Sequence, residues 1–70
     1  SRVRMHLEVG GVLFPVNQLR PDFAIVEATA AHSPGPASLL VAVDDALTVR
    51  QAVLPEGIPP GPFRTRLALV

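Results

Sequence analysis

Proline and glycine interrupt this chain too often for helices of ordinary length. Eight prolines and five glycines are spread over 70 residues. Proline breaks a helix because its ring removes an amide donor and clashes with the preceding turn. The recurring pattern is instead an alternation of apolar and polar side chains, which is typical of half-buried β-strands. The sequence therefore predicts an all-β fold.

The alternation defines six expected strands. Residues 3–9 alternate cleanly, and Gly10-Gly11 can form a tight turn into a returning strand. Residues 23–29 are apolar on nearly both sides, which predicts a central or covered strand. In the segment 47–54, the apolar residues Leu47, Val49 and Val53 share one face. The expected strands are residues 3–9, 12–16, 23–29, 38–44, 47–54 and 63–70.

Six short strands without a crossover helix predict a small antiparallel barrel or sandwich. It would consist of two hairpins, residues 3–16 and 38–54, and a C-terminal strand. We favour a partly closed barrel because closure removes unpaired edges. Pro15 lacks an amide donor and is expected on an edge or at a strand's end. The proline-rich segment 55–62 (PEGIPPGP) is expected to run extended over the surface.

The length predicts one domain, residues 1–70, with a thin stability margin. Ser1 to Arg4 would be either a tag remnant before a native start at Met5 or the beginning of a fragment. A chain of this size buries only about 60% of its unfolded surface, and it has no cysteine for a disulfide. Yet 49% of its residues are apolar. We therefore expect a homo-oligomer, in the simplest case a dimer, or a domain that docks on a parent or partner protein.

Composition argues against nucleic-acid and membrane partners. Six arginines balance six acidic residues, so no net charge attracts nucleic acid or an anionic membrane. Tryptophan and tyrosine are absent, and the three phenylalanines are expected in the core rather than as stacking platforms. No apolar run reaches the length of a membrane span and no secretory signal pattern is visible, so we expect a cytoplasmic protein.

The sequence predicts no catalytic site, no cofactor and no metal. His6 and His32 lie on different elements and are expected to face solvent. Asp44-Asp45 has the composition of a hairpin turn, although adjacent acids can also bind a hard cation or act as general acid and base. No serine lies in a nucleophile motif, and Gly10-Gly11 precedes a strand rather than a phosphate-binding helix. We therefore expect no enzyme activity.

Two pairs of arginines form the one candidate binding site. Arg2 with Arg4, and Arg64 with Arg66, each project from one face of an expected strand. If the first and last strands are neighbours, the four guanidinium groups form a single patch that could bind a phosphate or carboxylate. The alternative is a solvated face, or ion pairs with acidic side chains such as Glu8.

Three short stretches resemble a family of short, uncharacterised bacterial all-β proteins. The family order is Q-L-x-P-D-F-x-I, V-x-V-D and V-x-L-P-x-G-I. The matching stretches here are QLRPDFAI (18–25), VAVD (41–44) and VLPEGI (53–58), the last without the spacer after the valine. The resemblance implies a fold unit without an assigned activity, and it favours Met5 as the native start. Arg2 and Arg4 also resemble the arginine-rich opening of PilZ proteins, but the D/N-x-S-x-x-G motif is missing, so cyclic-dinucleotide binding is not predicted.

Two functional hypotheses follow. The first is a non-catalytic structural or protein-interaction module that self-associates through edge strands or an apolar sheet face. The second is a small β-barrel that binds an anionic ligand or nucleotide through the arginine pairs.

Overall fold

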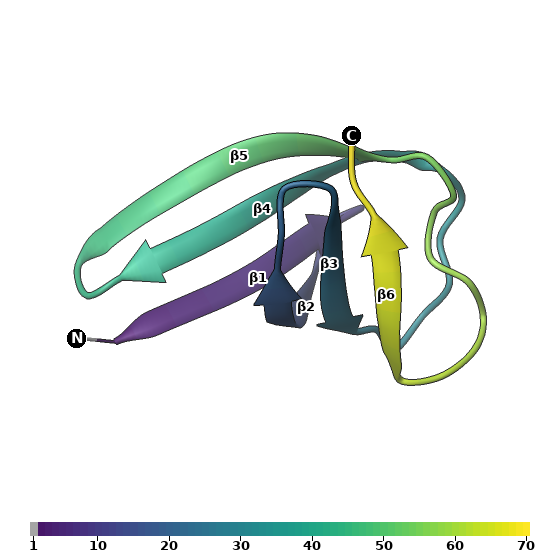
Figure 1. Cartoon of the computed structure of the whole chain (residues 1–70), viewed down its shortest axis with the longest axis horizontal. Helices are drawn as coiled ribbons and strands as arrows, with labels where there is room; N and C mark the ends of the chain where they lie inside the picture. The colour runs from purple at the N-terminus through teal and green to yellow at the C-terminus, as the bar shows by residue number, and fades with distance from the viewer. Residues whose placement is uncertain (1) are drawn as a thin grey trace.

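A computed structural model describes residues 2–70, and within them every regular element is a β-strand. The strands are β1 (Val3–Val9), β2 (Val12–Leu19), β3 (Phe23–Glu27), β4 (Gly35–Val43), β5 (Ala46–Leu54) and β6 (Arg64–Ala68), as Figure 1 shows. They form one antiparallel sheet in the order β5-β4-β1-β2-β3-β6. The predicted all-β class, with two hairpins and a C-terminal strand, is confirmed.

Both hairpin turns follow from local sequence. Gly10 and Gly11 have φ angles of 58° and 85° between β1 and β2, a left-handed conformation that glycine adopts without steric cost. Asp44 has a φ of 53° at the turn between β4 and β5, and aspartate is among the few other residues that tolerate it. The interpretation of Asp44-Asp45 as a turn is therefore confirmed.

The sheet bends in the middle of β2, where that strand changes partner. Residues up to Pro15 pair with β1, and from Val16 onward the strand pairs with β3. The register shifts between Val16 and Gln18, an irregularity of the kind that bends a strand at a corner. Pro15 thus lies in an interior strand and not on an edge, at the end of the ladder with β1. Its missing amide donor falls where the strand changes partner.

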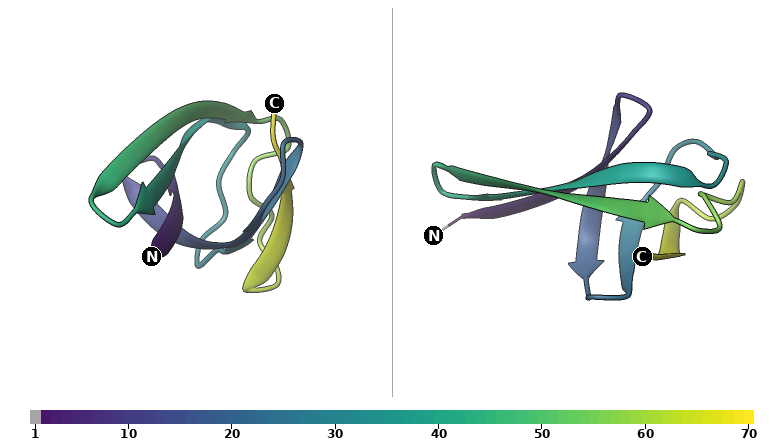
Figure 2. Two further views of the ribbon diagram at one scale, coloured as in Figure 1. Left: turned by 60° about the vertical axis from the view of Figure 1, so that its left-hand side comes forward. Right: turned by 90° about the horizontal axis from the view of Figure 1, so that it is seen from above.

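The bend folds the sheet into two parts that run crosswise and face each other (Figure 2). One part contains β1, β4, β5 and the start of β2, and the other contains β3, β6 and the end of β2. The core between them has no buried polar side chain among residues 2–70. Its members are Leu7, Val9, Phe14, Val16, Ala24, Val26, Ala37, Leu39, Ala52, Leu54, Ile58, Leu67 and Leu69.

The sheet is not closed into a barrel, so the sandwich-like alternative describes it better than the partly closed barrel that we favoured. Its outer strands are β5 and β6. Beyond β6 the chain reaches the opposite edge, where Val70 and Val53 exchange two backbone hydrogen bonds of 3.0 Å. This contact occupies one end of the outer edge of β5, and the rest of that edge has no backbone partner among residues 2–70.

The proline-rich segment 55–62 is more than a surface connector. Ile58 lies within it and is 2% exposed, as part of the core. Its backbone exchanges two hydrogen bonds, of 3.0 and 2.9 Å, with His32 in the other long loop. The prediction of an extended surface segment is therefore wrong at its centre, where the loop closes one end of the sandwich.

Candidate interaction surface

The structure does not bring the four candidate arginines together. Arg2 and Arg4 belong to the β1 region and Arg64 and Arg66 to β6, and two strands, β2 and β3, separate β1 from β6 in the sheet. The condition for a single four-guanidinium patch is therefore not met.

The β6 arginines are each engaged by a side chain of the neighbouring strand β3. The guanidinium carbon of Arg66 lies 4.0 Å from the centre of the Phe23 ring, a cation–π contact. The Nη2 atom of Arg64 lies 3.9 Å from the Oε2 atom of Glu27. Arg64 thus has an acidic partner of the kind that the alternative interpretation expected, whereas the partner of Arg66 is an aromatic ring.

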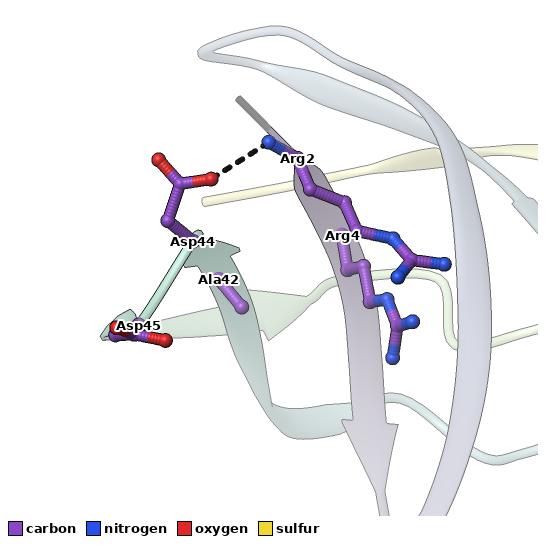
Figure 3. Close-up of a pocket in the computed structure, with 5 residues that line it drawn as sticks. All are labelled: Arg2, Arg4, Ala42, Asp44 and Asp45. Atoms are coloured by element: carbon purple, nitrogen blue, oxygen red, sulfur yellow. Dashed lines mark hydrogen bonds between the residues drawn. The ribbon is translucent and has the colours of Figure 1, made fainter.

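Arg2 and Arg4 line an open depression of about 440 Å³ together with Ala42, Asp44 and Asp45. The backbone and side chain of Asp44 both bond to the Arg2 backbone, in two hydrogen bonds of 2.9 Å. Figure 3 shows the two arginine side chains extending together, away from both carboxylates. Because two acidic residues balance the two arginines, the depression has no net charge with which to select an anion.

His32 does not face solvent as predicted. Its Nε2 atom is buried without a hydrogen-bond partner among residues 2–70, and its ring meets the buried Phe14 ring edge-on at 5.8 Å. The cause is the pairing with Ile58, which draws the loop onto the core. His6 is half-buried on β1. Residues 2–70 contain no group of three or more His, Asp or Glu side chains that could hold a metal ion.

Exposed apolar side chains concentrate on the edge strand β5. Leu47 is 64% exposed and Val49 is 52% exposed, and both lie on the face turned away from the core together with Val53. In this strand only Ala52 and Leu54 are buried. The alternation in residues 47–54 thus predicted the strand correctly. It did not predict that the face with Leu47, Val49 and Val53 would be exposed to solvent.

The backbone of β5 also presents unpaired hydrogen-bonding groups. Val53 uses its amide and carbonyl to bond Val70 on the side away from β4. Because these groups alternate in direction along a strand, those of Leu47, Val49 and Gln51 point the same way. They have no backbone partner among residues 2–70.

The other edge strand, β6, is shorter and more highly charged. It has five residues, two of which are arginines. By contrast, β5 has nine residues with Arg50 as its one charged side chain, and it contains neither lysine nor proline. Its pairing with β4 is regular, without a bulge. Charges, prolines and bulges are the usual means of blocking an edge, so β5 is the less protected of the two.

Comparison with known proteins does not assign the chain to a family: no family model matches it, and neither do any curated protein or solved structure. Residues 2–70 form no helix that is long and apolar enough to cross a membrane.

Proposed function

We propose that this protein is a non-catalytic structural or interaction module that self-associates through the free edge of β5. The observation that carries the proposal is the combination, on one strand, of exposed apolar side chains and unpaired backbone groups. A second copy can satisfy both at once, because strand addition supplies main-chain hydrogen bonds and covers the flanking side chains.

The same chain is the simplest partner because an antiparallel pair of identical edges is self-complementary. A two-fold axis perpendicular to the strands makes such a pair, with every contact repeated twice. The resulting dimer would contain one continuous sheet running from one copy into the other. Four arginines that do not converge give the anionic-ligand hypothesis less support, and we do not propose it.

The test is the oligomeric state of the wild type and of a variant with a blocked edge. The Val49 amide points away from β4, so Val49→Pro removes a donor that the monomer does not use. Val49→Thr is the matched control, because it keeps the amide and the β-branched shape. We expect light scattering at tens to hundreds of micromolar to give twice the 7.4 kDa chain mass for the wild type and Val49→Thr, and the single chain mass for Val49→Pro.

Far-ultraviolet circular dichroism must show the same strand content for the three proteins, so that loss of association is not loss of folding. A wild type that remains monomeric over this range contradicts the proposal. So does a folded Val49→Pro variant that still associates.

A further inference from the structure

The free edge of β5 and the charges beside it define how two copies would meet. Arg50 projects from the middle of this edge, and Asp44-Asp45 forms the turn at its beginning. Residues 2–70 contain no ion pair or side-chain hydrogen bond from Arg50 or from Asp45. An unpaired cation on β5, Arg50, and an unpaired anion in the turn before it, Asp45, thus lie five residues apart in the sequence.

The Val70 contact limits the registers that a two-fold β5 pair can adopt. Because Val70 already bonds Val53, a partner strand must end before that residue. If the pair is centred on Arg50, the partner strand needs the outward amide and carbonyl of Val53, which already bond Val70. This register also sets two arginines directly opposite each other, which is unfavourable. Centring it on Val49 places Asp45 of the second copy at the position that Val70 occupies.

Centring the pair on Thr48 avoids both conflicts. Leu47 then faces Val49 of the second copy, twice, so the two most exposed apolar residues of the edge cover each other. The two Thr48 side chains meet at the axis, a favourable cross-strand pair. The paired segment runs from Asp45 to Gln51 and stops two residues short of Val53.

We infer that β5 pairs with β5 of a second copy in the register centred on Thr48, where Arg50 meets the Asp44-Asp45 turn of that copy. In this register Arg50 lies opposite Ala46, the residue that follows the turn. The long arginine side chain reaches the carboxylates beside it. Centring the pair on Leu47 would also bring Arg50 to this turn, opposite Asp44, but only residues 46–48 of each β5 would then pair, so charge and strand length together favour Thr48. The inference rests on the proposed function, since it specifies the partner and contacts of the same edge.

The test exchanges the charges between chains. Arg50→Glu places an anion beside the acidic turn of its partner, and Asp45→Arg places a cation beside Arg50. One exposed ion pair changes an association constant by less than about fivefold. In this dimer the two-fold axis repeats the ion pair, and reversing one charge replaces an attraction by a repulsion at both places. We therefore expect each variant's dimer dissociation constant to rise about tenfold.

Mixing the two variants must restore association. In the mixed dimer, the glutamate introduced by Arg50→Glu in one chain meets the arginine introduced by Asp45→Arg in the other. At the second contact, the unchanged Asp45 of the first chain meets the unchanged Arg50 of the second. Native mass spectrometry of the mixture is expected to show the mixed dimer in excess over either homodimer, and added salt is expected to reduce that excess.

The outcomes separate this inference from the proposal on which it rests. If both reversals leave the dimer unchanged while Val49→Pro abolishes it, β5 is the interface but this register is wrong. If the wild type does not associate, the proposed function fails and the register fails with it. Both replaced side chains are exposed, so we expect the variants to fold, and circular dichroism checks that they do.

Discussion

Gly57 allows the two long loops to meet, and Gly57→Ala is expected to separate them. Its φ is 67°, a conformation that costs other residues about 1–2 kcal/mol. A Cβ atom at this position would overlap the carbonyl oxygen of His32 and lie 2.8 Å from the backbone nitrogen of Pro34. Because these are backbone atoms, no side-chain rotation relieves the overlap, and the loops must move apart.

The free-energy cost of moving the loops apart comes from the contacts that they make with each other and with the core. Separation breaks the two backbone hydrogen bonds between His32 and Ile58, at about 1 kcal/mol each. It also exposes part of the buried Ile58 side chain, for about 1 kcal/mol more. With the cost of the backbone conformation, we expect Gly57→Ala to lower the free energy of unfolding by about 4 kcal/mol. A domain of this length has roughly 4–10 kcal/mol in total.

Gly10→Ala is the matched control. Gly10 has a similar φ of 58°, but a Cβ atom there meets only the His32 Cε1 atom, at an ordinary 3.7 Å. The control should therefore lose about 1–2 kcal/mol, the cost of the conformation alone. Since the chain has no tryptophan or tyrosine, unfolding in urea is best followed by circular dichroism. Several protein concentrations are needed, because the proposed association would add to the measured stability.

With a slope of about 1 kcal/mol per molar urea, the midpoint should fall by about 4 M for Gly57→Ala and by about 1–2 M for Gly10→Ala. Equal midpoints for the two variants would refute the argument that backbone overlap, and not φ alone, fixes glycine at this position.

Two paired comparisons test the remaining contacts. Arg66→Ala should lower the free energy of unfolding by about 0.5–1 kcal/mol through loss of its aromatic contact. The Arg64 side chain is 68% exposed and forms an ion pair with Glu27, so Arg64→Ala should change the free energy of unfolding by less than about 0.5 kcal/mol. Urea midpoints compare the two variants, and a larger loss for Arg64→Ala contradicts this ranking. Phe14→Ala should lower the free energy of unfolding by about 3–5 kcal/mol, because the Phe14 ring is buried. Phe63→Ala, at a ring that is 57% exposed, should cost less than about 0.5 kcal/mol, and similar thermal midpoints for the two would contradict the assignment of the core.

The sequence predicts the strands and turns well because these depend on local chemistry. Alternating side chains and Gly10-Gly11 are enough to define the first hairpin, and Asp44-Asp45 marks the second. Partner choice is not local. The separation of the arginine pairs depends on β2 changing partner after Pro15, whereas the sequence predicts only an edge or a strand's end at that residue.

Side-chain burial was harder to predict where long loops take part. Phe63 was expected in the core but is mostly exposed, and His32 was expected in solvent but packs on Phe14. The second difference arises from the pairing of the two loops, which brings His32 onto the core beside Ile58. The available signal was a single large apolar residue, Ile58, among prolines, which a surface connector would not require.

The length of β5 explains why its core-facing side is only partly buried, whereas Leu47 and Val49 are exposed because they lie on the opposite face. The crosswise layer that covers this strand is three strands wide, which at about 4.8 Å per strand amounts to about 14 Å. The nine residues of β5 extend over about 30 Å at about 3.3 Å each. About half of the strand must therefore project beyond its cover, in agreement with the burial of Ala52 and Leu54 and the exposure of residues 46–51. The pairing proposed over residues 45–51 would occupy the free edge of this same projecting half.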